Sequence, residues 1–223
     1  MTQFKRPKTA QEAVLVEIRE QLLNGRLQPG DAIRPDVIGE QLGVSAVPVR
    51  EALRILEGEG QVRYRPHRGY LVTELTADDL MEMYRIRELL EAEAVREAIS
   101  NLQEDDIQTM RSAIEDMELA RDDVVKIRAA NRRFHFALLD AAQMPHLSRM
   151  INWLWDASEP CHYRSANFMH EENLERVARE HQQILDAVIA GDASKIIDEL
   201  TKHQRHAFEV VREELKVEQS KAS

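Results

Sequence analysis

Cysteine, glycine and proline are scarce in this chain of 223 residues, and each scarcity excludes a class of protein. The single cysteine, Cys161, rules out an intramolecular disulfide framework and a cysteine-rich zinc site. With only 8 glycines and 7 prolines, a turn-rich all-β fold is disfavoured and long helices are expected. No stretch reaches the roughly 18 uncharged apolar residues of a membrane span, and the N-terminus lacks the apolar run of a signal peptide. We therefore expect a cytoplasmic protein with no membrane partner.

Charge is spread unevenly along the chain. Residues 1–75 carry 11 Lys and Arg against 10 Asp and Glu, a net charge of +1, whereas residues 76–223 carry 19 against 30, a net charge of −11. Of the eight histidines, only His67 lies in the first part. This asymmetry predicts two domains, 1–75 and 76–223, with different binding partners.

The first part reads as three helices followed by a hairpin. Apolar residues at helical spacing predict helices over 11–24, 36–42 and 45–58. A glycine lies at the end of each of these helices, and the turn sequence at 27–30 separates the first helix from the second. Two short β-prone runs, 61–64 and 70–73, flank the basic loop 65–69 and indicate a hairpin. This order predicts a winged helix-turn-helix domain.

From Thr76 onward nearly every segment has helical periodicity. We expect helices over 77–99, 103–121, 123–142, 146–157, 171–190 and 192–217, with breaks near Asn101, Pro145, Pro160 and Gly191. The predicted fold class is therefore mainly α, with a winged helix-turn-helix followed by an all-α antiparallel helical bundle.

The helix pair around Gly43 presents groups suited to double-stranded DNA. The exposed first turn of its second helix carries four candidate DNA-binding residues, namely Ser45, Ala46, Val47 and Arg50. The hairpin loop adds Arg65, His67, Arg68 and Gly69, which suit a wing lying along the phosphate backbone or the minor groove. An apolar helix pair with a few arginines is by itself typical of a plain bundle, and the basic hairpin shifts the interpretation towards DNA.

The run LGVSAVPVREALRILEGEG at 42–60, followed by RPHRGYLV at 65–72, resembles the GntR family of bacterial winged-helix regulators. The resemblance implies binding to a near-palindromic operator as a homodimer. Ala46 and Val47 stand where the family commonly has Arg and Thr. A contact from one of them to a thymine methyl group would replace the usual Arg–guanine contact, so we expect a different operator sequence.

Four polar side chains of the second part fall on inward helix faces. Asn131 and His135 lie four residues apart on one face. His181 and His203 lie in apolar stripes at about 15 and 18 Å from the turn at Gly191, so antiparallel helices would bring them level. Inward polar groups need partners, and a shared metal ion would satisfy them together. The alternative is that each histidine is a core residue with its own hydrogen-bond partner.

The second part resembles the FCD effector-binding domain of the FadR subfamily of GntR regulators over about residues 77–212. The resemblance lies in RIRELLE at 85–91, NRRFH at 131–135, REHQQIL at 179–185 and His203. Members of this type often bind a divalent metal through an Asp and three His, which match Asn131, His135, His181 and His203. Neutral donors suit zinc, nickel, cobalt or manganese.

Arg87, in the family's R-x-x-x-E pattern with Glu91, suits a small carboxylate effector, as do Tyr163 and Arg164 near the predicted helix break. The alternative for Arg87 is an ion pair with Glu91 on a solvated helix face. The combined interpretation is a transcriptional regulator, a repressor rather than an enzyme, controlled by a small organic acid bound near the metal. Two alternatives are a regulator for which the metal itself is the signal, and a helical metalloenzyme, against which the lack of an HExxH motif counts.

Overall fold

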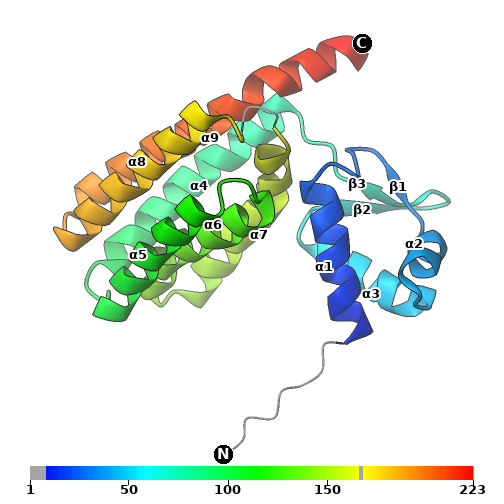
Figure 1. Cartoon of the computed structure of the whole chain (residues 1–223), viewed down its shortest axis with the longest axis horizontal. Helices are drawn as coiled ribbons and strands as arrows, with labels where there is room; N and C mark the ends of the chain where they lie inside the picture. Colours follow the sequence, from blue (N-terminus) through cyan, green and yellow to red (C-terminus); the bar gives the residue numbers. More distant parts are fainter. Residues whose placement is uncertain (1–8, 166–167, 223) are drawn as a thin grey trace, which may run out of the picture. The chain divides into compact units, whose positions relative to one another are not determined.

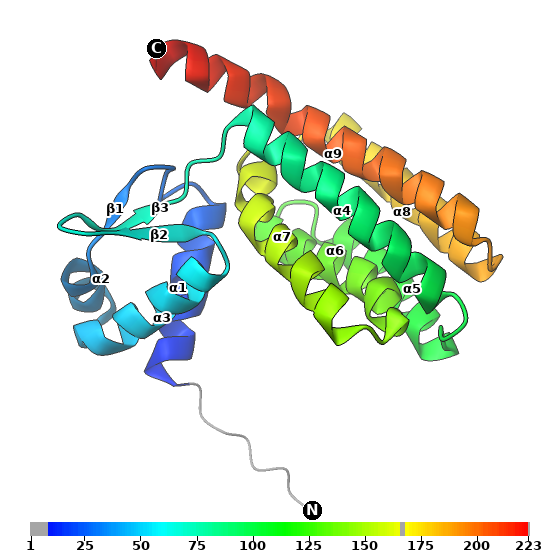
Figure 2. The same ribbon diagram turned by 180° about the vertical axis from the view of Figure 1, so that it is seen from behind.

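The computed structural model describes residues 9–165 and 168–222, and the side chains of all of these except Arg164 and 213–222. The chain divides into two compact units, which we call unit 1 (Met1–Glu74) and unit 2 (Leu75–Ser223). Figures 1 and 2 show unit 1 with its small sheet and unit 2 built of helices.

Unit 1 is a winged helix-turn-helix, as predicted. Its helices are α1 (Ala10–Leu23), α2 (Pro35–Leu42) and α3 (Ala46–Gly58). Strands β1 (Ala32–Ile33), β2 (Val62–Arg65) and β3 (Gly69–Val72) form an antiparallel sheet in the order β1-β3-β2. The helices pack on one apolar core that includes Ile18, Val49, Leu53 and Leu56, all of them fully buried.

Two glycines shape the turn between α2 and α3. Gly43 ends α2 in the left-handed conformation, with φ of +66°, which side chains with a Cβ rarely adopt. Gly39 allows a close approach, since a Cβ there would lie 2.8 Å from the carbonyl oxygen of Val44. The start of α3 is therefore held against α2 by backbone packing that only glycine permits.

Strand β1 was not predicted from the sequence. It has only two residues, Ala32 and Ile33, too few for alternation to be visible. Pairing with β3 creates it, with Ala32 opposite Leu71 and Ile33 opposite Tyr70. The strand is a product of tertiary contact rather than of local propensity.

Unit 2 is an antiparallel helical bundle, as predicted. Its elements are α4 (Ala77–Ala98), α5 (Glu104–Leu119), α6 (Val124–Leu139), the 3-10 turn η1 (Asp140–Ala142), α7 (Pro145–Arg164), α8 (Glu171–Ile189) and α9 (Ala193–Ala222). A capping box between Thr76 and Asp79 sets the start of α4. The main core includes Val95, Phe134, Leu138 and Ile184.

Helix α7 continues where the sequence predicted a break. The expected helix over 146–157 was to stop before Pro160, but α7 runs through Pro160 to Arg164. A proline inside a helix removes one hydrogen bond and bends the axis without necessarily ending it. Packing decides the outcome here, because Glu159, Cys161 and Tyr163 on either side of the proline are buried in the bundle. Helix α9 is likewise longer than predicted, reaching Ala222 instead of residue 217.

Candidate metal centre and nucleic-acid interface

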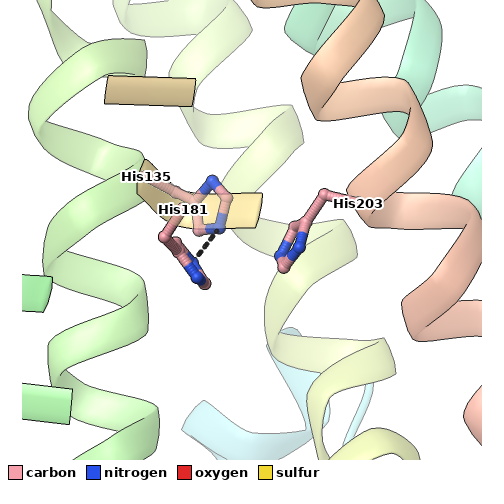
Figure 3. Close-up of side chains that lie close together, drawn as sticks. All are labelled: His135, His181 and His203. Carbon is pink, nitrogen blue, oxygen red and sulfur yellow. Dashed lines mark hydrogen bonds between the residues drawn. The ribbon is translucent and has the colours of Figure 1, made fainter. Parts of the chain in front are cut away.

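Three histidines from three helices converge inside unit 2. His135 of α6, His181 of α8 and His203 of α9 each offer a ring nitrogen, and these nitrogens lie within 4.8 Å of one another. Figure 3 shows the three rings close together, with the hydrogen-bond line between His135 and His181. The exposed fractions of His135, His181 and His203 are 2%, 0% and 9%. The predicted convergence of the three imidazoles is thus present in the fold.

Both ring nitrogens of His181 face an oxygen atom, although a neutral imidazole can donate to only one of them. Its Nδ1 lies 2.8 Å from the carbonyl oxygen of Val177, and its Nε2 lies 2.8 Å from Oδ1 of Asn131. Burial, the largest cause, and the neighbouring His203 hold the pKa of His181 well below its usual value, so the ring is neutral. A neutral imidazole donates only one hydrogen bond, so with this amide orientation one lone pair faces another.

His135 presents a second unsatisfied group. Its Nε2 lies 3.3 Å from Nε2 of His181, and its buried Nδ1 has no hydrogen-bond partner among the described residues. Desolvation first, and then the charges of His181, His203 and Arg87, lower the pKa of His135 well below its usual value. Neutral imidazoles this close together carry ring-nitrogen lone pairs that one cation can share, so these residues fit a divalent metal.

Glu180 orients the third imidazole. One of its carboxylate oxygens lies 2.7 Å from Nδ1 of His203, and the other lies 2.5 Å from Nδ1 of His206. Burial raises the pKa of Glu180, but the hydrogen bonds and charges of the two histidines outweigh it and lower the pKa overall. When Nδ1–H of His203 donates to the carboxylate, Nε2 is left with its lone pair, the arrangement found behind many metal-bound histidines. The sequence pattern around Glu180 gives no sign of this role.

A narrow cavity of about 20 Å³ borders the cluster. Its lining includes Asn131 and His203, the predicted effector residue Tyr163, and two residues that sequence analysis missed, His162 and Arg176. Desolvation, the largest cause, lowers the pKa of His162 to about 3. Burial also raises the pKa of Tyr163, so both side chains are neutral. The sequence around His162 and Arg176 has no pattern that indicates a binding site. Only the packing of the helices shows that these two residues face a cavity.

Arg87 lies in a buried network instead of on a solvated face. Its Nε donates to Oε1 of Glu91 at 2.9 Å, and its guanidinium carbon lies 4.1 Å from the ring centre of Trp155. Glu91 also accepts hydrogen bonds from Trp155 at 2.8 Å and from Gln204 at 2.5 Å. Burial disfavours charge on Arg87, but the Glu91 carboxylate offsets it and the pKa is raised. The Arg87–Glu91 pair therefore joins α4, α7 and α9.

The side chain of Arg164, another predicted effector residue, lies outside the described residues.

The candidate DNA-binding residues gather on two parts of unit 1. Ser45 occupies the N-cap position of α3 without a side-chain capping hydrogen bond. Val47 and Arg50 project from the first turns with exposed side chains, while Ala46 is half-buried. Strands β2 and β3 pair up to Arg65 and Gly69, so the exposed Arg65, His67 and Arg68 lie at or near the tip of the hairpin. Gly69 has a φ of +77°, in the left-handed region that the sharp turn requires.

Among the described residues, no helix is both long and apolar enough to cross a membrane.

Two family models match separate parts of the chain. The model described as "Bacterial regulatory proteins, gntR family" matches residues 10–72, which cover the winged helix-turn-helix. The FCD domain model matches residues 82–206, which cover most of the helical bundle and all three histidines. Together the two matches span more than half of the chain.

Similar proteins of known name are transcriptional regulators. The chain is 31% identical to the HTH-type transcriptional regulator McbR of Escherichia coli over 80% of each chain. It is 32% identical to the "Probable D-xylose utilization operon transcriptional repressor" of Paenarthrobacter nicotinovorans, over 82% of this chain and 80% of that protein. The solved structure of E. coli McbR/YncC superposes with a TM-score of 0.80 at 27% identity, covering 93% of this chain and 99% of that one.

Proposed function

The chain belongs to the GntR family of bacterial regulators with an FCD domain, and from this premise we propose that a small organic acid controls its binding to operator DNA. As a family member it is a DNA-binding transcriptional regulator and not an enzyme. The observation that carries the proposal is the meeting of His135, His181 and His203 beside a cavity. We place the protein in the cytoplasm, where operator DNA is found, and propose that it acts as a repressor.

His135, His181 and His203, with the carbonyl oxygen of Asn131, would hold the metal. Nitrogen donors with one amide oxygen suit zinc, nickel, cobalt or manganese. When bound, a divalent cation supplies positive charge and open coordination positions to a carboxylate. Because all four donors are neutral, no ligand from the chain offsets that charge, which favours an anionic effector over a neutral one.

Tyr163, Arg87 and Arg164 are the proposed effector-binding residues. Tyr163 lines the cavity and is held neutral by burial, so its hydroxyl remains a hydrogen-bond donor. Only Nε of the Arg87 guanidinium has a hydrogen-bond partner among the described residues, which leaves its terminal nitrogens for a carboxylate. Arg164 is included for its place beside Tyr163. The acid changes operator binding only if it binds one conformation of the dimer more tightly than the other.

Calorimetric titration with small carboxylates, such as citrate and lactate, tests this control. Full-length protein loaded with metal should bind one of the acids, and chelator-stripped protein should bind it at least tenfold more weakly. His135→Ala should behave like stripped protein, whereas His170→Ala, which alters an exposed histidine just before α8, should behave like wild type. Equal binding by loaded and stripped protein would separate the metal from effector recognition.

A metal-sensing regulator is the second candidate. The cavity of about 20 Å³ holds little more than a water-sized group, which favours the ion alone as the signal. Gel shifts with metal but no organic acid discriminate the two candidates. A change in DNA affinity on adding metal alone supports metal sensing, and a change that requires the acid supports effector control.

For operator binding we propose that the first turn of α3 reads the major groove and that the hairpin contacts phosphates. Ser45, Arg50, Arg65, His67 and Arg68 are all exposed and free of the core. Arg50→Ala should weaken operator binding in a gel shift. Arg68→Ala should weaken it on all sequences and reduce the slope of log affinity against log salt by about 0.9. Arg133→Ala, an exposed change in unit 2, is the control and should alter neither.

We propose a homodimer formed through an apolar face on α4 and α7. Leu89, Met150 and Trp153 on this face are exposed by 72%, 57% and 47%, and a hollow of about 470 Å³ lies among Ile86, Leu90 and their neighbours on α7. Exposed apolar area of this kind marks a protein contact. Trp153→Glu should shift the dimer towards monomer in sedimentation velocity. Leu119→Glu, an exposed leucine on α5, should not.

A further inference from the structure

The solvent face of α3 carries one apolar side chain among charged ones. Val49, Leu53 and Leu56 point into the core with no exposed surface. The exposed side, at the complementary helical spacing, holds Val47, Arg50, Glu51, Arg54 and Glu57. If α3 enters the major groove, as proposed above, this exposed side meets the base edges.

Val47 is not explained by the folding of unit 1. Its side chain is 59% exposed, more than that of Val16 (45%), Val37 (44%) or Tyr64 (55%), the other large exposed hydrophobics of the unit's described residues. A β-branched residue in an exposed helical turn adds neither core burial nor helix propensity. Its preceding neighbour Ala46 is half-buried and carries a single methyl group. Val47 is therefore the apolar group that a DNA partner would cover.

The chemistry of the groove narrows the partner of Val47 to one base. Most atoms on the base edges of the major groove are hydrogen-bond donors or acceptors, and the thymine C5-methyl is the apolar exception. Valine neither donates nor accepts, so a polar edge placed against it loses water without gaining a bond. We propose that Val47 reads a thymine in each operator half-site through contact with its methyl group.

Arg50 gives the position of that thymine. It lies three residues after Val47 on the same exposed face, and its guanidinium approaches Asp36 of α2 at 3.6 Å. Three residues of helix rise about 4.5 Å, against about 3.4 Å between base pairs. The thymine read by Val47 therefore lies one or two base pairs from the contact made by Arg50.

The proposal rests on the placement of α3 in the groove, and one experiment separates the two. Full-length protein is first used to select binding sites from a random duplex DNA library. Each thymine of the selected half-site is then replaced by deoxyuridine, which removes the methyl group and keeps every hydrogen-bonding atom. At one thymine, wild-type protein should lose about three- to fivefold in affinity, as expected for one buried methyl group. The Val47→Ala protein should lose less than about twofold at that thymine.

Val37→Ala is the matched control, since it shortens an exposed valine of α2 and should keep the wild-type response to deoxyuridine. If every deoxyuridine substitution affects wild type and Val47→Ala equally, or if the half-site contains no thymine, the methyl contact is overturned while DNA binding stands. If Arg50→Ala and Val47→Ala both leave the affinity for the selected site unchanged, the placement of α3 fails as well.

Discussion

The two units differ in where they keep their polar chemistry. In unit 1 the core is apolar, and Gln61 is the one buried side chain classed as polar among the described residues. Its exposed arginines include Arg50 and Arg54 of α3 and Arg65 and Arg68 of the hairpin. In unit 2 charged and imidazole groups such as Arg87, Glu91, His135 and His181 are buried. Charges that meet a polyanion such as DNA must lie on the surface, whereas charges buried inside a helical bundle must each be paired or neutral.

The largest expected effect tests the buried polar interior of unit 2. Glu91→Ala removes the partner of Arg87, Trp155 and Gln204 and should lower the free energy of unfolding by about 3–5 kcal/mol. Urea denaturation followed by tryptophan fluorescence measures this, because both tryptophans of the chain lie in α7. Glu93→Ala, which breaks the exposed pair with Arg96, should cost about 0–1 kcal/mol. Similar losses in the two variants would erase the contrast between buried and exposed pairs.

The corresponding test in unit 1 involves no charge. In Gly39→Ala the new Cβ meets the carbonyl oxygen of Val44, and forcing α2 from α3 should cost about 1–3 kcal/mol. DNA affinity should fall while metal affinity in unit 2 stays unchanged. Gly58→Ala is the control, since its Cβ would meet nothing within 4 Å. Circular dichroism melting and a gel shift provide the measurements, and a DNA affinity as high as that of Gly58→Ala would contradict the tight-turn argument.

A third prediction concerns the carboxylate behind the imidazole cluster. Glu180→Gln weakens the hold on His203 and should reduce metal affinity about 10–100-fold, measured by competition with a chelator. Glu175→Gln alters an exposed carboxylate of the same helix, paired with Arg179 at 3.7 Å, and should leave metal affinity as it is. Matching affinities in the two variants would mean that Glu180 does not orient the ligand.

The smallest expected effect is on how steeply the free energy of unfolding depends on pH, compared between metal-free wild type and a variant of His162. Burial lowers the pKa of His162 from 6.5 to about 3, so below pH 6.5 the unfolded chain binds a proton that the folded chain does not. The stability associated with neutral His162 is therefore complete above pH 6.5, and falls by about 1 kcal/mol per pH unit as the pH drops towards 3.

Urea titrations between pH 7 and pH 5 measure that slope. His162→Gln should show a shallower slope than wild type, whatever its absolute stability. His170→Gln, an exposed histidine in unit 2, should keep the wild-type slope. An unchanged slope in His162→Gln would assign the acid sensitivity to other groups.

Features with a strong local signal were predicted correctly from the sequence. The start of α3 was predicted from the turn at Gly43 and from Ser45, which takes the N-cap position although its side chain makes no capping hydrogen bond. The hairpin was predicted from two β-prone runs on either side of a basic loop. That His181 and His203 lie side by side was predicted by counting residues to the turn at Gly191, because α8 and α9 are regular helices with a fixed rise per residue.

Features decided by packing were not predicted. A continuous α7 across Pro160, the two-residue strand β1, and the cavity faces of His162 and Arg176 all depend on residues distant in sequence. Arg87 shows the same limit in another form. The sequence indicates a partner four residues away at Glu91, but it does not show that Trp155 and Gln204 close over the pair.

The amino-acid sequence alone predicted a mainly helical chain of two parts, with a helix-turn-helix whose second helix begins with Ala46 and Val47. Periodicity, capping residues and glycine positions act over a few neighbouring residues, so they are visible in the sequence without knowledge of the tertiary structure. Only the tertiary structure decided which polar groups meet: His135 with His181, Glu180 with His203, and Glu91 with three partners. Those contacts join helices far apart in the chain, and their cost or benefit depends on burial, which exists only once the bundle is packed.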